Sequence, residues 1–512
     1  MFQCMCFTSS AGRNVGGLSC VHSQYSQTCS SKLPIDILPY NVFLDMFNFC
    51  LHETTMFSIE RANKWQALVH VCQRWRQIIF ASPRRLALHL NCTHRTPVRR
   101  NLSFWPSTLP LTIDYPGPPL FRSHRLLWDD GNSNIIAVLE HPSRVHRIMI
   151  HAPSPLLSEV ATVMQKPFPA LKHLDLEWEL EASRTTARPS KGLPIPGSFL
   201  CESSPLLQHL RLKCISFPQL RVFLLSTPNL VALELKSIPK NDHIPTEAIV
   251  ASLAALTRVE TFSITFYEYD DYMSPPDQNE SRADLPIRAI LPVLTNFCFR
   301  GYCEYLEDFL AQITTPRLDI FRIEYSAHEI EAPQLSKFID RTENLKLNQF
   351  RHAKVMFYLA TVVQLDCSQE CGKARLILDF SDAVHLLDEQ VPYVTGVLGQ
   401  LVSTFSNIDH LSFHGDNVNS SNMESDWLRF FHLLPAVKAL HLSGGVGRGG
   451  IYCFCTGRGY RRDGRRTFYS SRLDLARPGR KPGQRRASGI HREISLLAPA
   501  LWSPCNCPGH GR

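Results

Sequence analysis

Two groups of residues near the C-terminus have the types and spacings that a cofactor or a metal ion would use. A G-x-G-x-x-G pattern, formed by Gly445, Gly447 and Gly450, follows a predicted strand. A dinucleotide site also needs a helix that starts at these glycines. The residues that follow, IYCFCTGRGYRR, have no amphipathic period, so we expect no such site. Four cysteines could supply a zinc ion with thiolates: Cys453, Cys455, Cys505 and Cys507. Their C-x-C spacing favours coincidence.

Three histidines recur every five residues at His141, His146 and His151. This spacing does not align them on one helix face, and Pro142 separates the first from a predicted strand. We find no G-x-S-x-G motif, no phosphate-binding loop and no paired carboxylates in a shared motif. The sequence therefore suggests neither catalysis nor a cofactor or metal, and we expect a protein that is not an enzyme.

The middle of the chain repeats a pattern that would place polar residues on one regular surface. The template L-x-x-L-x-L recurs, and its well-marked copies are 23 to 36 residues apart. The copies are Val145/Ile148/Ile150, Leu171/Leu174/Leu176, Leu207/Leu210/Leu212, Leu230/Leu233/Leu235, Val259/Phe262/Ile264, Leu294/Phe297/Phe299, Leu318/Phe321/Ile323, Ile408/Leu411/Phe413 and Val437/Leu440/Leu442. Amphipathic helical stretches lie between them. A strand plus a helix at this period predicts a leucine-rich-repeat solenoid over 134–443.

Residues between the apolar strand positions would face the concave surface of such a solenoid. The candidates for contact with a target are Asp175, Arg211, Glu234, Arg322 and His441. Their charges are mixed, so they indicate no particular class of target. Ordinary solvated surface is the other interpretation of each.

The repeats are irregular. Glu179, Ile215 and Ile238 stand where the template expects Asn or Cys. We predict a loose patch near 346–375, in which only RLILDF is strand-like, and a connecting segment over 91–133. An ordinary α/β domain is the alternative to the solenoid.

The stretch LPYNVFLDMFNFCL, residues 38–51, predicts a short and unusually apolar helix. One apolar stripe contains Val42, Phe43, Met46, Phe47, Cys50 and Leu51. Leu44 and Phe49 lie off this stripe and need a second cover, from the fold or from a partner. The following segment, KWQALVHVCQRWRQIIF, keeps helical spacing until Ser82-Pro83. Residues 33–90 are thus a helical unit that is too small to bury all these side chains well.

An F-box is resembled by Leu38-Pro39, then Val42, Phe43, Leu44, Met46 and Phe47, and then the stretch LVHVCQRWR. The continuation FASPRRLALHLNCTHRTPVRRNLSFWPSTLPLTI resembles F-box proteins of mushroom-forming fungi. The resemblance implies docking onto the Skp adaptor of a cullin–RING ubiquitin ligase. It makes the following residues candidates for the interface or its support: Leu38, Pro39, Val42, Phe43, Met46, Phe47, Leu68, Cys72 and Trp75. The alternative is that all nine belong to the core of the unit.

The net charge of +8 arises in the C-terminal segment. From Gly445 onward, thirteen arginines and one lysine face three acidic residues, so the rest of the chain is nearly neutral. We predict a disordered Arg/Gly-rich tail over 444–512. Such a tail would bind RNA or acidic surfaces, but the abrupt end of the repeats favours a shifted or mis-spliced reading frame. Residues 1–32 are expected to form a disordered leader, with no secretory signal.

The seventeen cysteines are scattered, which favours reduced thiols in the cytoplasm or nucleus. The expected fold is α/β, a small N-terminal helical F-box followed by an irregular leucine-rich-repeat solenoid. The function that this implies is a non-catalytic substrate-recognition subunit of an SCF-type ubiquitin ligase, with the Skp adaptor, the cullin and RING subunits and a protein substrate as partners. Membrane or nucleic-acid partners are not expected. The alternatives are a repeat scaffold with a degenerate F-box and, less favoured, an RNA-binding protein that acts through the tail.

Overall fold

The computed structural model describes residues 37–52, 65–83, 85–86, 88–93, 97–115, 128–179, 191–202, 204–239, 242, 244–266, 288–325, 333–345, 350–357, 361–367, 375–380, 387–401, 407–415 and 424–444. The predicted leader, the loop over 53–64 and the predicted tail beyond Gly444 lie outside these residues. The chain divides into two compact units. We call the described residues up to Leu86 the helical unit, and those from Leu88 onward the sheet unit.

The helical unit contains α2 (Tyr40–His52), α3 (Trp65–Val69) and α4 (Gln73–Ala81). Pro39 precedes α2, and its carbonyl accepts hydrogen bonds from the N–H groups of Val42 and Phe43 at 3.1 and 3.3 Å. A missing N–H costs nothing at a helix start, so proline suits this place. The second helical stretch was predicted as one helix but consists of two. The chain turns at 70–72, and the Cys72 side chain accepts a hydrogen bond from the Trp75 N–H at the start of α4.

The sheet unit has one large, mostly parallel sheet of fourteen strands. In spatial order they are β1 (Leu90–Cys92), β2 (Leu111–Tyr115), β3 (Val145–Ala152), β4 (His173–Trp178), β6 (His209–Lys213), β8 (Ala232–Ile238), β9 (Thr261–Phe266), β11 (Asn296–Gly301), β13 (Ile320–Tyr325), β16 (Arg375–Phe380), β15 (Thr361–Cys367), β14 (Phe350–Phe357), β17 (His410–Gly415) and β18 (Ala439–Gly444). Two small sheets pair β5 (Leu193–Pro194) with β7 (Ile215–Ser216) and β10 (Ala289–Ile290) with β12 (Ile313–Thr314).

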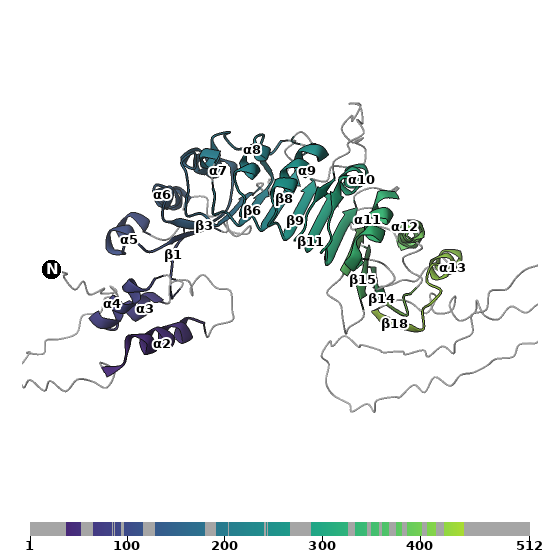
Figure 1. Ribbon diagram of the computed structural model, residues 1–512, viewed down its shortest axis with the longest axis horizontal. Helices are drawn as coiled ribbons and strands as arrows, with labels where there is room; N and C mark the ends of the chain where they lie inside the picture. The colour runs from purple at the N-terminus through teal and green to yellow at the C-terminus, as the bar shows by residue number, and fades with distance from the viewer. Residues whose placement is uncertain are drawn as a thin grey trace, which may run out of the picture. The chain divides into compact units, whose positions relative to one another are not determined.

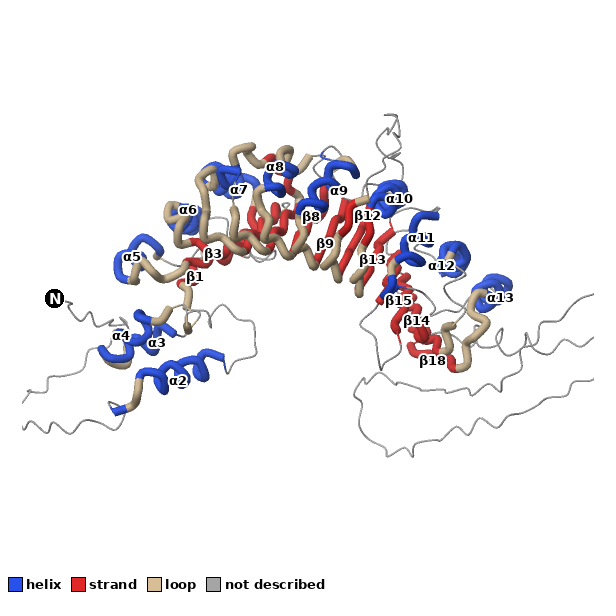
Figure 2. The backbone as a smooth tube through the Cα atoms, viewed as in Figure 1, coloured by secondary structure: helices blue, strands red, loops and turns tan. Residues whose placement is uncertain are grey.

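Helices lie along one face of this sheet (Figure 1, Figure 2). They are α5 (Val98–Phe104), α6 (Trp128–Leu139), α7 (Ser154–Val163), α8 (Leu220–Leu225), α9 (Thr246–Ala255), α10 (Cys303–Gln312), α11 (Pro333–Arg341), α12 (Leu387–Gln400) and α13 (Glu424–His432), with short 3-10 turns at Phe199–Glu202 and Glu343–Leu345. We call the other face of the sheet the open face. No helix within the described ranges has the length and apolar character needed to cross a lipid bilayer.

The apolar positions of the repeated template form the core between the sheet and the helices. The last two apolar positions of each copy lie in a strand, and from β3 to β13 they align in register. One row runs from Ile148 through Leu174 to Phe321, and the neighbouring row runs from Ile150 to Ile323; these residues are 0–3% exposed. Side chains alternate across a strand, so an apolar row toward the helices leaves a polar row on the open face.

The sheet begins earlier than the sequence indicated. The predicted connecting segment, 91–133, contains β2 and most of β1, and these strands extend the parallel sheet through Ile113, which pairs with Ile148. The segment also contains α5 and the start of α6. Its apolar residues lie in two short runs without the full template, which is why the repeat count missed them.

The predicted loose patch, 346–375, also contains strands. β14 and β15 pair antiparallel, and β15 pairs antiparallel with β16. Only three residues separate β14 from β15. So short a connection reverses the chain, because a parallel pair needs a crossover of a dozen residues or more. β15 thus runs against its two neighbours in the sheet. On either side of this insertion the pairing is parallel, between β16 and β13 and between β14 and β17.

Candidate functional site

One side of α2 belongs to the core of the helical unit. Phe43, Leu44 and Phe47 are at most 1% exposed. The rings of Phe43 and Phe47 lie 6.1 and 5.0 Å from the Trp75 ring of α4. Arg74 lies 4.8 Å above the Phe43 ring and donates a 2.7 Å hydrogen bond to the Leu38 carbonyl. The unit thus has an aromatic core of its own, fixed to the turn that precedes α2.

The opposite side of α2 exposes apolar side chains. Val42 and Met46 are each 39% exposed, and Phe49 is 63% exposed. These positions are i, i+4 and i+7, which share one face of a helix. Ile37 and Tyr40 are also exposed, at 71% and 41%. Tyr40 lies three and four residues before Phe43 and Leu44, on the buried side of the helix, and its hydroxyl is hydrogen-bonded to that of Ser82. We call Val42, Met46 and Phe49 the α2 face.

The predicted apolar stripe was therefore wrong in its orientation. Val42 and Met46 were grouped with Phe43 and Phe47 but lie outside the core, whereas Leu44 was placed off the stripe and is buried. The helix is apolar on most sides, so its spacing alone does not determine which side the unit covers.

The nine predicted interface residues occupy three kinds of position. Val42, Pro39, Met46 and Cys72 are exposed; Leu38, Leu68 and Trp75 are half-buried; Phe43 and Phe47 are buried. The last two can only support an interface. Sequence reasoning missed Ile37 and Tyr40 as members of the exposed surface, although Phe49, at i+3 from Met46, was noted as needing a second cover.

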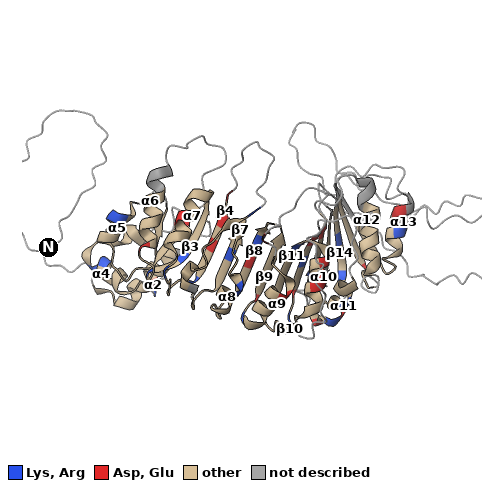
Figure 3. Cartoon of the chain, turned by 90° about the horizontal axis from the view of Figure 1, so that it is seen from above, with Lys and Arg blue, Asp and Glu red and all other residues tan. Residues whose placement is uncertain are grey.

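The open face of the sheet presents the five predicted target-contact residues in a single row. Cross-strand register links Asp175, Arg211 and Glu234, continues through Ser263 and Cys298 to Arg322, and ends through the inserted strands at His441. Figure 3 shows both signs of charge distributed along the sheet. The row is thus a real structural feature of the open face.

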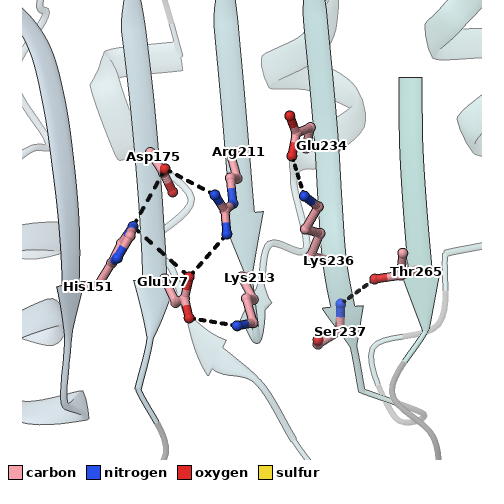
Figure 4. Close-up of polar contacts among 9 residues, drawn as sticks. All are labelled: His151, Asp175, Glu177, Arg211, Lys213, Glu234, Lys236, Ser237 and Thr265. Atoms are coloured by element: carbon pink, nitrogen blue, oxygen red, sulfur yellow. Dashed lines mark hydrogen bonds and ion pairs between the residues drawn. The ribbon is translucent and has the colours of Figure 1, made fainter. Parts of the chain in front are cut away.

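Ion pairs on β3, β4 and β6 form one network on this face (Figure 4). Glu177 contacts Lys213 at 2.6 Å and Arg211 at 3.2 Å. Asp175 has longer contacts, 3.5 Å to His151 and 3.6 Å to Arg211. The neighbouring Asp175 carboxylate raises the pKa of His151, although burial acts in the opposite direction.

A second network lies on β11, β13 and β16. Arg322 contacts Glu324 and Asp379 at 2.8 Å each, and Arg300 contacts Glu324 at 3.4 Å. Beside the first network, β8 carries the Glu234–Lys236 ion pair at 2.6 Å, and the next strand, β9, presents Thr261, Ser263 and Thr265 and no charge. The open face therefore has two balanced charged regions separated by a neutral polar strand.

Three cysteines of the described residues have thiols that burial makes less acidic. Burial raises the pKa of the Cys92 thiol to about 12 and also raises the pKa values of Cys214 and Cys298, so these thiols stay protonated at neutral pH. Within the described residues, no three histidine, cysteine or carboxylate side chains gather as a metal site.

The fold and these two surfaces define a mixed α/β protein with a large, mostly parallel sheet. No protein-family model and no curated protein sequence matches the chain.

Proposed function

We propose that this chain is the substrate-recognition subunit of an SCF-type cullin–RING ubiquitin ligase, in which the helical unit is an F-box and the sheet unit is an irregular leucine-rich-repeat solenoid. The observation that carries the proposal is the α2 face. Its apolar side chains lie on the surface of the helical unit, whose aromatic core is already formed by Phe43, Phe47 and Trp75. Contiguous exposed apolar side chains of this kind mark a surface for another protein.

The α2 face can supply part of the free energy of docking. Burying one large apolar side chain stabilises by roughly 1.5–3 kcal/mol, less what is already covered. Association costs about 4–15 kcal/mol in lost freedom. With Val42 and Met46 39% exposed and Phe49 63% exposed, burial of what remains of these three side chains contributes about 2–4 kcal/mol, so neighbouring residues must supply the rest.

The sheet unit supports the role of target holder. Parallel strands that alternate with helices, with one apolar row toward the helices and polar rows on the open face, are typical of repeat proteins that bind partners on an extended surface. The chain itself would supply no catalytic group. Holding a target near a ubiquitin-conjugating enzyme raises its effective concentration there, and the partner enzymes perform the chemistry.

The variant Phe49→Ala tests this proposal. Because a buried aromatic at the centre of an interface contributes about 2 kcal/mol or more, we expect its loss to weaken capture of a co-expressed Skp adaptor by at least about tenfold. The measurement is the affinity of the purified full chain for the adaptor by titration calorimetry.

Phe104→Ala is the matched control. Phe104 lies on α5 and is 66% exposed, close to the 63% of Phe49, so the same ring is removed from a surface without a proposed adaptor role. The proposal fails if both variants bind the adaptor like the unmodified chain. Adaptor capture without any cullin in the purified complex would favour the scaffold alternative instead.

A further inference from the structure

Asp175 is a buried carboxylate with few donors. It lies on β4 at the open face, and only 4% of the residue is exposed. Its Oδ2 contacts His151 and Arg211 at 3.5 and 3.6 Å, beyond the usual length of a hydrogen bond. Its Oδ1 has no hydrogen-bond partner within the described part of the chain. A buried charge normally requires close donors, so this one is incompletely satisfied.

Asp114, two strands away, has the same deficit. It aligns with Met149 on β3, which in turn aligns with Asp175, so the two carboxylates flank a neutral side chain. Adjacent strands lie about 4.8 Å apart, which places the two backbones roughly 10 Å from each other. The buried Oδ1 of Asp114 also lacks a hydrogen-bond partner among the described residues.

The surrounding charges favour a positive ligand at this place. Four carboxylates lie around Met149 on the open face of β2 to β4 and at the residue after β4: Asp114, Asp175, Glu177 and Glu179. Among the described residues of these three strands, Arg147 is the one Lys or Arg on this face. Glu177 is occupied by Lys213 and Arg211 from β6. Burial raises the pKa values of Asp114 and Glu179, although the charges of Arg147 and His151 act in the opposite direction on Asp114, and those of His151 and Lys213 do so on Glu179.

We propose that the open face at Met149 binds an arginine or lysine side chain from an extended segment of a partner protein, with the alkyl stem over Met149 and the charged group between Asp114 and Asp175. The inference rests on the proposed function in that it takes this partner to be the target held by the sheet unit. Arginine fits best, because its planar group donates in several directions at once.

His151 makes this binding depend on pH. It lies on β3, 3.5 Å from Asp175 and 4.0 Å from Glu177. It also has charge interactions with Arg211, Asp114 and Glu179. A proton on His151 places a positive charge beside the site and competes with the ligand. Affinity should therefore rise as pH increases through the pKa of His151.

The test uses the full chain and a fluorescein-labelled octapeptide of alternating glycine and arginine, with the glycine–glutamate octapeptide as the charge control. We expect saturable binding of the arginine peptide that weakens with salt. Asp114→Asn should weaken it by about tenfold, the loss of one charge-assisted hydrogen bond. Met149→Lys should abolish binding, because it supplies a cation to the same space, and should also raise the melting temperature.

Ser412→Lys is the matched control for Met149→Lys. Ser412 lies in the same cross-strand row, but its neighbours are Lys354 and His441, so no carboxylate flanks the new lysine. It should leave peptide affinity unchanged and should not raise the melting temperature. Equal binding by the unmodified chain, Asp114→Asn and Met149→Lys overturns the proposal, as does equal binding of the glutamate peptide.

Two further outcomes separate the alternatives. Binding that appears only after removal of residues 445–512, which carry thirteen arginines, would show that the chain's own basic segment occupies the site and would overturn the assignment to a partner. Adaptor affinity is measured on the same variants. Met149→Lys should leave adaptor affinity intact, so loss of peptide binding with normal adaptor binding supports this inference, whereas loss of adaptor binding through Phe49→Ala concerns the proposed function alone.

Discussion

Replacing Phe297 by alanine should destabilise the sheet unit by about 3–5 kcal/mol, the range for removing a fully buried aromatic ring. Phe297 is 0% exposed. Its ring stacks between those of Phe262 and Phe321, at 5.5 and 5.2 Å with interplanar angles of 11°, and it lies 5.3 Å from Phe309 of α10. The mutation removes the middle ring of this stack and leaves a cavity between the sheet and the helix layer.

Urea unfolding followed by circular dichroism measures the effect as a lower midpoint with an unchanged slope. Phe104→Ala serves here too, because an exposed ring should change stability by less than about 0.5 kcal/mol. A loss below about 1 kcal/mol for Phe297→Ala would mean that the ring is not part of a packed row. A changed slope would show that the repeats no longer unfold together.

The apolar rows were accessible to sequence analysis because each copy of the template carries its own signal. In HLDLEW or HLRLK, two leucines separated by one polar residue fix which side chains point to the helices. Register then follows from burial, since a slip of one residue would expose Leu174 and bury its neighbours. The five target-contact candidates could be placed in one row for the same reason.

The antiparallel insertion carried no comparable signal. In β14, Ala353 and Val355 are buried and Lys354 faces the open side. Where the template has a large apolar residue, β14 has the small residue Ala353. The direction of β15 depends on the short connection after Phe357, which is a constraint of chain geometry and not of composition. Pattern matching therefore found β16 but neither β14 nor β15.

The α2 face shows a different limit. Spacing identifies a helix, but a helix that is apolar on several sides offers more than one stripe. Which side is covered depends on Trp75, which belongs to another helix and packs on Phe43 and Phe47. The turn at 70–72 between α3 and α4 determines where Trp75 lies. The helical spacing of KWQALVHVCQRWR gives no sign of this turn. Tertiary packing decided the exposed face, and with it the residues offered to a partner.

Stability should fall on mild acidification because of His173. Its ring lies 5.3 Å from that of His209, and Arg147 is its register partner on β3. Burial, followed by the charges of Arg147 and His209, lowers the pKa of His173 from 6.5 to about 4, although Asp175 and Glu234 act in the opposite direction. Between these two pH values the unfolded chain binds a proton that the folded chain does not. The contribution of this group is therefore present above pH 6.5 and is lost as pH falls toward about 4.

The expected loss is about 2–3 kcal/mol, somewhat below the full value of the shift because the ring is only half-buried. Urea unfolding at about pH 7, 5.5 and 4.5 measures it, and His173→Gln should flatten the decline over this interval. His141→Gln, which removes an exposed imidazole from a turn, controls for the loss of one titratable group. An identical acid decline in the unmodified chain and in His173→Gln would show that the His173 proton is not what destabilises the fold. A flattened decline would identify the row of Arg147, His173 and His209 as a part of the open face that is more stable while His173 is neutral.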